Sequence, residues 1–570
     1  MPFLPTNLAE AKARNWPELD IIIVNGDAYV DHPSFGAAVI GRYLEAAGFR
    51  VGIIPQPDWS RDEDFMALGR PRLFFGITAG NMDSLVSNYT AQRKRRNDDA
   101  YSPGGVAGLR PDRATLVYAN ALKRIYKNVP LVLGGIEASL RRIAHYDYWQ
   151  DKVRGSLLAD TKADFLVYGM GEKASLEIAS ALQAGTKPEH LTDIGGTVVF
   201  SPLPPTPDSM ILPDNKACVD KPTFRRMTML FENNHQEQVL YQQNGGRWLK
   251  HNPPAASLKP DELDAIHSLP FEYAPHPRYQ GATIPAFEQI KSSITSHRGC
   301  YGGCHFCAIS SHQGRRLQSR SKDSIVAEAK SMVLRQGKSV TITDIGGPTA
   351  NMYASACKLD FPASCKRASC LYPTICKNLL PDHQAQLSLL GEIERLPGVK
   401  HVFIASGVRH DLALRSPQYV AALATKYTGG RLKLAPEHSV DRVLELMGKP
   451  SVSLYEEFAK EFFAACKKGG IKRQIIPYLI IGHPGTTLQD ALELRAWLMK
   501  HNLRVEQVQE FTPTPMTVST CMYYTGLDYQ TGKPIHIPKP GEIRKQKELA
   551  LWHQYPDRKT RTGKKGNTQN

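Results

Sequence analysis

The 570-residue chain lacks the long apolar runs of membrane proteins and has few cysteines for its length. No apolar run reaches the ~18 residues that a membrane-spanning helix needs. Its 10 cysteines are too few for a disulfide scaffold, and its 44 glycines and 40 prolines follow no triplet period, which excludes a collagen-like chain. We therefore expect a globular protein that does not span a membrane.

The first ten residues lack the basic head, apolar core and small-residue cleavage site of a signal peptide. This predicts a cytoplasmic protein, whose thiols are kept reduced. Seven of the 10 cysteines lie between Cys300 and Cys376, and such clustering in a reducing compartment favours metal ligation over crosslinking. The formal net charge of +16 suits an acidic partner such as nucleic acid, but many basic enzymes carry a similar excess.

Apolar runs alternate with helical patterns through residues 1–200. Most of these runs close on a glycine that leads towards a helix, which is typical of buried parallel strands. We predict a doubly wound, Rossmann-like α/β domain here, followed by a connector over 201–287 with scattered prolines. The expected strands of the first domain are 20–25, 50–54, 73–78, 131–133 and 165–168.

A second alternating block begins near residue 288 and contains six candidate strands with five helices between them. Six strand–helix units fall short of the eight of a closed barrel, so 288–530 is predicted to form a partial (βα)6 TIM-type barrel. It carries a cysteine-containing insertion at 349–380, and a C-terminal extension with a basic tail follows at 531–570. The expected strands are 292–296, 339–344, 399–405, 431–435, 475–481 and 505–511. The expected helices are 322–335, 384–395, 417–426, 454–468 and 488–501.

Three cysteines at C-x3-C-x2-C spacing follow the first strand of this block: Cys300, Cys304 and Cys307. Thiolates this close in sequence can each bind one iron of a cubane cluster, and the intervening glycines let the backbone wrap around it. With only three local thiols, one iron is left to bind a small molecule. The alternative is a zinc site, which normally takes four ligands and would need a neighbouring histidine: His297, His305 or His312.

The triplet, with Phe306 directly before its last cysteine, resembles the signature loop of radical S-adenosylmethionine (SAM) enzymes. Segments 343–351, 405–409, 434–438 and 511–515 resemble the YgiQ family of radical SAM proteins. This likeness extends over most of the chain, from residue 20 to about residue 526.

The resemblance implies a mechanism and its cofactors. Cys300, Cys304 and Cys307 would ligate three irons of a [4Fe–4S] cluster whose fourth iron binds SAM. An electron donor such as a flavodoxin or ferredoxin would reduce the cluster, which then cleaves SAM into methionine and a 5′-deoxyadenosyl radical. That radical would abstract a hydrogen atom from a substrate that the resemblance does not identify.

The resemblance also implies residues that bind SAM. A Gly-Gly-Glu-like turn after the second strand of these enzymes holds the methionine amino group, and here that place is taken by Gly346, Gly347 and Pro348. Gly482 and Gly485 resemble the segment that packs on the adenine, although a strand-ending turn uses the same residues. Polar residues just past the third and fourth strands tend to face the site of a barrel, with a helix cap or a surface ion pair as the alternative: Ser406, Arg409 and Glu437.

A second group of four cysteines lies in the insertion between the second strand and the next helix: Cys357, Cys365, Cys370 and Cys376. Strand-to-helix loops gather at the carboxyl face of such barrels, so we expect this insertion near the mouth of the site. Four thiols can hold an auxiliary iron–sulfur cluster or a structural zinc, and the alternative is four free thiols. Cys218, Cys466 and Cys521 are isolated and are expected to be structural.

In some radical SAM families the front domain binds cobalamin, and segments 133–139 and 168–172 resemble part of such domains. One binding mode uses a D-x-H-x-x-G loop, but here Asp31 and His32 are adjacent and Gly36 follows four residues later, so the spacing does not match. We expect a front domain without cobalamin that gates the site or binds substrate, and the alternative is a domain that binds cobalamin without supplying a cobalt ligand.

Two hypotheses on function follow. The first is a radical SAM enzyme acting on an unidentified substrate. The second is a zinc-stabilised nucleic-acid-binding protein without radical chemistry, for which the charge and basic stretches such as 314–320 speak, although no known nucleic-acid signature is present. An intermediate possibility is an RNA-modifying radical SAM enzyme, which predicts salt-dependent RNA binding.

Overall fold

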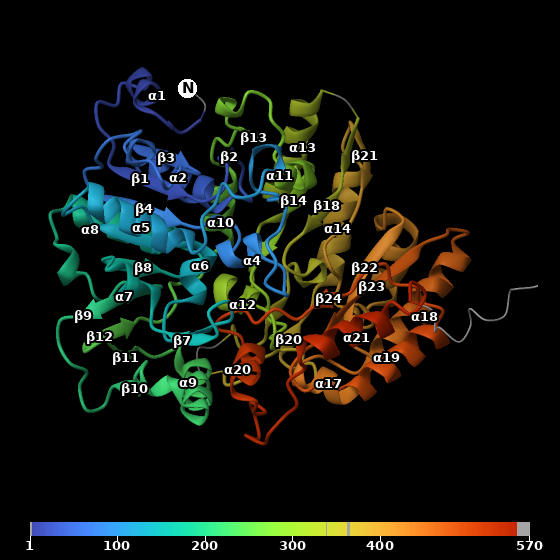
Figure 1. The fold of residues 1–570 in the computed structure, drawn as a ribbon. Helices are drawn as coiled ribbons and strands as arrows, with labels where there is room; N and C mark the ends of the chain where they lie inside the picture. The colour runs from blue at the N-terminus through green and yellow to red at the C-terminus, as the bar shows by residue number, and fades with distance from the viewer. Residues whose placement is uncertain (1–2, 338, 362–364, 556–570) are drawn as a thin grey trace, which may run out of the picture.

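Five parallel strands in the order β3-β1-β4-β5-β8, with β3 at the edge, form one side of a nine-stranded sheet in the N-terminal half of the chain (Figure 1). The structure is a computed structural model and describes residues 3–337, 339–361 and 365–555. The bounds of the five strands are β1 Ile21–Asn25, β3 Val51–Pro55, β4 Phe74–Thr78, β5 Leu131–Gly134 and β8 Phe165–Val167. All five agree with the predicted strands to within a few residues.

Successive side chains of β1 enter two separate apolar cores. Ile21 packs in the core that includes residues of α2 (Gly36–Ala46), whereas its neighbour Ile22 packs in the core that includes residues of α5 (Ala114–Ile125). Every residue of β1 is buried, which explains its continuous apolar sequence. Helices therefore cover both faces of the sheet, and the predicted Rossmann-like architecture is confirmed.

The segment 201–287, expected to be a connector, instead extends this sheet. Beyond β9 (Thr197–Ser201), which runs antiparallel to β8, the sheet gains three strands: β12 (Arg247–His251), β11 (Leu240–Asn244) and β10 (Met210–Leu212). β11 and β12 form a hairpin across Gly245 and Gly246, and both glycines have positive φ, as a tight two-residue turn requires. The strand prediction missed β11 and β12 because their sequences are largely polar, and it missed β10 because that strand has only 3 residues.

The C-terminal half contains six parallel strand positions (Figure 1). The second position is one strand interrupted at Thr343, and the third joins the fourth through a parallel bridge between Val408 and Leu434. The strands are β14 (Ser293–Thr295), β17 (Val340–Ile342) with β18 (Asp344–Gly346), β21 (Val399–Val402), β22 (Arg431–Glu437), β23 (Gln474–Ile481) and β24 (Gln509–Glu510). The predicted partial barrel is confirmed.

The predicted helices of the barrel are also present. The third one changes character after Ala422, where a π-helical turn spans Leu423–Tyr427. The helices are α13 (Lys322–Gln336), α14 (His383–Glu394), α16 (Pro417–Ala422), α18 (Val452–Lys468) and α19 (Leu488–Lys500).

The C-terminal extension packs back onto the barrel. In one apolar cluster, Ala550 of α21 (Pro540–Ala550) packs with Leu494 of α19 and Ile481 of β23. The basic stretch 558–565 lies outside the described residues. Among the residues that are described, no helix is long and apolar enough to cross a membrane.

Candidate metal centre

The cysteine triplet lies in a tight loop at the carboxyl end of β14. Gly299 has a φ of +86°, and a Cβ there would meet the Arg316 carbonyl oxygen at 2.2 Å. Gly303 has a φ of +62°, and a Cβ there would meet the Ala368 carbonyl oxygen at 2.6 Å. Only glycine fits at both positions, so the loop can wrap closely around what its side chains hold.

Two of the three sulfurs lie around Gly302. A Cβ on this residue would stand 3.3 Å from Cys300 Sγ and 3.9 Å from Cys304 Sγ. The third cysteine is one turn further on, where the Cys307 amide donates a hydrogen bond to the Cys304 carbonyl at 3.1 Å. Cys300 and Cys304 both act electrostatically on Cys307, so the structure brings the three thiols near one another.

The surroundings of the triplet disfavour free thiolates. Burial, together with the neighbouring Cys304, raises the pKa of Cys300 and raises that of Cys307 to about 12. Metal-bound cysteine is deprotonated, so thiolates form here at neutral pH only when a cation neutralises them. This donor set therefore fits a cationic iron–sulfur cluster.

Arg409 brings a positive charge to the sulfurs. Its Nη1 donates to Cys304 Sγ at 3.6 Å, while Nε and Nη2 donate to the two carboxylate oxygens of Asp411 at 2.9 and 2.5 Å. Although burial opposes the charge, Asp411 and the thiols keep the pKa of Arg409 above its usual value. Arg409 thus lies beside Cys304, and its assignment to SAM binding stays a prediction; Asp411 was not foreseen.

Glu437 also lies near the triplet, at the end of β22. It is 7% exposed, its φ is +70°, and Lys449 Nζ lies 3.5 Å from its carboxylate. Burial raises the pKa of Glu437, against the opposing effects of Lys449 and Arg409, and Glu437 in turn helps to raise the pKa of Cys307. A buried acid in a strained backbone conformation beside the thiols is typical of a functional position.

The predicted Gly-Gly-Pro turn lies beside the triplet, but its first carbonyl is engaged. Gly346 O accepts hydrogen bonds from the Ser296 amide at 2.7 Å and the Ser296 hydroxyl at 3.1 Å. Gly347 packs so closely on His297 that a Cβ would meet the ring at 2.7 Å. Within this turn, the carbonyls of Gly347 and Pro348 are therefore the ones that could still accept a hydrogen bond from a ligand.

Ser406 forms hydrogen bonds with the carboxylate of Asp344, a residue that the sequence analysis did not single out. Asp344 Oδ1 accepts hydrogen bonds from the amides of Ala405 at 2.8 Å and Ser406 at 3.0 Å, and Oδ2 accepts from the Ser406 hydroxyl. The two sides of this contact come from the second and third strand positions. Ser406 thus joins these two strands rather than pointing at the sulfurs.

The segment after β23 is covered by the C-terminal extension. The Gly482 amide donates to Gln546 Oε1 of α21 at 2.8 Å, and the Gly485 amide donates to the His536 carbonyl at 2.7 Å. A Cβ on Gly482 would meet Ile543 at 3.1 Å. These contacts are those of a strand-ending turn that receives a packed helix.

The three histidines of the zinc alternative are engaged elsewhere. His297 Nε2 donates to the Thr349 carbonyl at 3.0 Å, His305 Nδ1 to the Leu446 carbonyl at 3.0 Å, and His312 Nδ1 lies 2.9 Å from a serine hydroxyl. Among the residues that the structure describes, no three His, Cys, Asp or Glu side chains converge closely enough for a single metal ion. A cubane needs no such convergence, because each of its irons takes one thiolate.

The front domain contacts the helix that follows the triplet, α12 (Ile309–Gln313). The hydroxyl of Ser139, after β5, lies 2.9 Å from His312 Nδ1, and Arg142 Nη1 donates to the Ser311 carbonyl at 3.1 Å. The carboxyl edge of the front sheet thus meets the barrel beside the triplet. His32 is buried away from this contact, and its Nδ1 accepts a hydrogen bond from the Ser34 amide at 3.0 Å.

The insertion packs on the triplet loop, as its place at the carboxyl face predicted. Ser369 Oγ donates to the Gly302 carbonyl at 2.6 Å, and the Cys370 amide donates to the Tyr301 carbonyl at 3.0 Å. The two groups of cysteines therefore belong to neighbouring loops.

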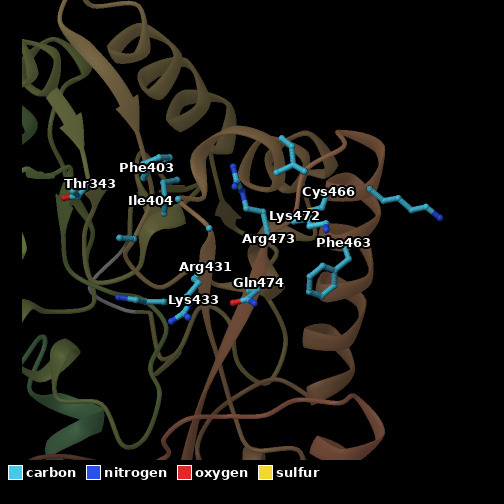
Figure 2. Close-up of a pocket in the computed structure, with 15 residues that line it drawn as sticks. Thr343, Phe403, Ile404, Arg431, Lys433, Phe463, Cys466, Lys472, Arg473 and Gln474 are labelled. Carbon is cyan, nitrogen blue, oxygen red and sulfur yellow. The ribbon is translucent and has the colours of Figure 1, made fainter. Parts of the chain in front are cut away.

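At the opposite end of the barrel lies an open basic hollow of about 920 Å³ (Figure 2). Arg431 begins β22 and Gln474 begins β23, so the hollow lies at the amino ends of strands whose carboxyl ends face the triplet. Five of its lining residues are basic: Arg431, Lys433, Lys467, Lys472 and Arg473. None of the described lining residues is acidic, and Arg473 Nε is buried without a hydrogen-bond partner among the described residues.

Comparison with known proteins decides the family. The model of the Radical SAM N-terminal family matches residues 3–293, and that of the Radical SAM superfamily matches residues 294–498. A UPF0313 protein of Geobacter sulfurreducens is 50% identical over 561 residues, covering 97% of this chain and 93% of the relative. The chain belongs to the UPF0313 family of radical SAM proteins. A third model, a domain of unknown function (DUF3362), matches residues 506–551, which include α21.

Other UPF0313 relatives are equally full-length. One from Thermotoga neapolitana is 48% identical over 560 residues, with 96% of this chain and 98% of the relative covered. One from Methanocella arvoryzae is 47% identical over 554 residues, with 96% and 92% covered. The expected radical SAM membership is thereby confirmed, and the resemblance to YgiQ-type proteins is consistent with it. The alternative of a nucleic-acid-binding protein without radical chemistry is set aside.

Solved structures with a similar fold share little sequence with this UPF0313 chain. TsrM from Kitasatospora setae, described with cobalamin and a [4Fe–4S] cluster bound, has 15% identity and a TM-score of 0.49, with 93% of this chain and 84% of that chain covered. The cobalamin-dependent radical enzyme OxsB has 12% identity and a TM-score of 0.47, with 96% and 57% covered. Likeness at this level assigns no ligand to this chain. The expectation of a front domain without cobalamin gains no support from it and stays a prediction.

Proposed function

We propose that Cys300, Cys304 and Cys307 hold the [4Fe–4S] cluster of this radical SAM enzyme. The observation that carries the proposal is the pair of sulfurs on either side of Gly302, with Arg409 on one of them. When bound, the cluster supplies the electron that cleaves SAM into methionine and a 5′-deoxyadenosyl radical. The chain itself supplies three thiolates, a cation beside them and a loop that only glycines allow.

The residues around the thiols divide into two sets. Arg409, Glu437 and the turn Gly347–Pro348 lie beside the triplet, and we assign them to holding SAM or substrate. Ser406, Gly346, Gly482 and Gly485 have bonds to other parts of the chain, and we assign them to shaping the carboxyl face. Catalysis then takes place at the carboxyl face of the barrel, which residues 288–530 form. The front domain, residues 1–200, covers α12 beside this face.

An enzyme of this class needs a reductant and a substrate. We infer a small electron-transfer protein, a flavodoxin or ferredoxin, as the reductant, and the cytoplasm as the compartment where such a donor and reduced thiols coexist.

A decisive experiment is anaerobic purification and cluster reconstitution, followed by incubation with SAM and dithionite. Wild type should form 5′-deoxyadenosine, and Cys304→Ala should form less than about 1% as much, because a missing ligand leaves the cluster unanchored. Cys218→Ser, a buried thiol far along the chain from the triplet, is the matched control and should keep wild-type activity. Equal nucleoside from wild type and Cys304→Ala would refute the assignment.

The basic hollow supports a second, narrower candidate, an RNA substrate. Five cations without an acid favour phosphates, and the unpartnered Arg473 Nε is a donor for one of them. Because the hollow is at the far end of the barrel from the triplet, its ligand must be long to reach both places, as an RNA strand is.

Salt titration of RNA binding tests this candidate. Arg431→Glu/Lys433→Glu should weaken binding and lower the slope of log K against log salt by about 1.4, the value expected for two lost phosphate contacts on a single strand. Lys187→Glu/Lys216→Glu makes the same charge change at exposed positions outside the hollow and should have less effect. Equal losses in both variants would mean that the hollow is not the binding site.

A further inference from the structure

Three of the four cysteines of the insertion, all but Cys365, are joined by a short chain of backbone hydrogen bonds. Cys357, in β19 (Ala356–Cys357), pairs with Leu379, in β20 (Leu379–Leu380). The Leu379 amide donates to the Cys376 carbonyl at 3.1 Å, and the Cys376 amide donates to the Cys370 carbonyl at 2.8 Å. Residues far apart in the insertion are therefore brought to one place, although the insertion has little regular structure of its own.

The side chains of this group influence one another. The other three thiols of the insertion lie close enough to Cys370 to act electrostatically on its thiol. Arg367 braces the loop, since its guanidinium donates to the carbonyls of Ser369 at 3.0 Å and Thr374 at 2.6 Å. Four thiols carried by one loop are a donor set for a soft metal.

We propose that a second metal centre, an iron–sulfur cluster or a zinc ion, is held by the four thiolates of the insertion: Cys357, Cys365, Cys370 and Cys376. As at the triplet, the described side chains do not converge on a single ion, so a zinc ion would draw them inward, whereas a cluster would accept them further apart. Each thiol loses its proton when the metal binds.

The position of this centre next to the triplet loop indicates a structural role. Cys370 and Cys376 pack beside Cys300 and Tyr301 in one small apolar cluster. Ser369 and Cys370 bond the carbonyls of Gly302 and Tyr301, which lie between the first two cysteines of the triplet. The metal in the insertion holds Ser369 and Cys370 in place, and their hydrogen bonds hold the triplet loop in its curved shape.

The experiment uses the full chain without the triplet, Cys300→Ala/Cys304→Ala/Cys307→Ala. After anaerobic reconstitution with iron and sulfide, or purification with zinc, it should retain about four irons or one zinc per chain. Adding Cys370→Ser should reduce this content at least tenfold, whereas adding Cys218→Ser should not change it. Iron with acid-labile sulfide identifies a cluster, and zinc identifies a single-ion site.

A triplet-free chain that holds no more metal than the same chain carrying Cys370→Ser would overturn the proposal. If the triplet-free chain does not fold, Cys376→Ser in the chain with an intact triplet gives the second measurement, and an unchanged metal content there would also overturn it. Both readouts are metal contents, so failure here is distinct from failure of the triplet assignment, which is read from 5′-deoxyadenosine formed by the intact chain.

Discussion

The front domain and the barrel each have parallel strands whose carboxyl ends form one edge, and the two edges carry different polar side chains. In the front domain Arg110 pairs with Asp27 at 2.8 Å and with Asp99 at 2.9 Å, and the buried Glu137 accepts the amides of Ser84 and Thr115 at 3.0 Å. The polar groups at this edge are therefore largely paired with one another by ion pairs and hydrogen bonds.

At the barrel edge the groups are thiols and two ion pairs, Arg409–Asp411 and Lys449–Glu437, the second of which includes the buried acid. Arg409 gives two of its nitrogens to Asp411 and the third to Cys304. The polar groups at the front-domain edge are thus paired with one another, whereas the barrel edge presents thiols that can bind a cluster. This difference indicates which of the two edges carries the chemistry.

The largest expected effect comes from filling the space between the sulfurs. Gly302→Val should abolish iron binding and reduce 5′-deoxyadenosine formation more than about 100-fold, because the new methyl groups would occupy the space beside Cys300 and Cys304 Sγ. Gly407→Val is the control at the same edge, since a Cβ there meets nothing within 4 Å. Iron content and product yield should change in the first variant alone; retention of iron by Gly302→Val would contradict the contrast between the edges.

Removing the arginine from each edge sharpens the comparison. Arg110→Met and Arg409→Met should each lower the free energy of unfolding by about 3–5 kcal/mol, because each leaves a buried carboxylate without its partner. Urea unfolding of the metal-free proteins measures this loss. Only Arg409→Met should also slow 5′-deoxyadenosine formation at 20 °C, about tenfold for a lost hydrogen bond to a charged group. Equal slowing by Arg110→Met would mean that stability alone governs activity.

A pH-dependent effect is expected at His297, which burial keeps neutral in the folded chain. Its pKa is lowered to about 4, so between pH 4 and the usual 6.5 the unfolded chain binds a proton that the folded chain does not. Stability therefore falls as pH drops from 6.5 to 4, by about 3 kcal/mol for this residue. Urea titrations across this window should show a shallower pH dependence in His297→Gln than in wild type. His401→Gln, at an exposed position, is the control, and an identical slope in all three proteins would refute the effect.

The smallest effect is expected where the two domains meet. Ser139→Ala removes a hydroxyl that contacts His312, the Gly135 carbonyl and the Gly169 amide, and it should cost about 1–3 kcal/mol of unfolding free energy because these hydrogen bonds are lost together. Iron content should stay at the wild-type level, because the triplet itself is untouched. Loss of iron on this substitution would show that the front domain helps to build the metal centre.

Local sequence patterns predicted the strands and helices of both domains, because buried strands and amphipathic helices leave periodic apolar signals. The triplet was found for a similar reason, since its three cysteines lie within eight residues of one another. The hairpin of β11 and β12 was missed, although Asn244-Gly245-Gly246-Arg247 between two short strand patterns is a turn signal that would have located it.

Contacts between distant segments were beyond the reach of such patterns. Nothing local in the sequence indicates that Gln546 of the C-terminal extension reaches Gly482, or that Ser406 binds Asp344. The same holds for Arg409, whose position past the third strand was predicted, whereas its bonds to Asp411 and Cys304 depend on how the strands pack.

The central claim is that the triplet holds a cluster with one iron open to SAM. Electron paramagnetic resonance of the dithionite-reduced, reconstituted protein, recorded with and without SAM, tests it most directly. The account predicts that SAM shifts the g values of a cluster signal in wild type and that this SAM-dependent shift is missing in Cys304→Ala. A wild-type spectrum that SAM leaves unchanged would contradict it.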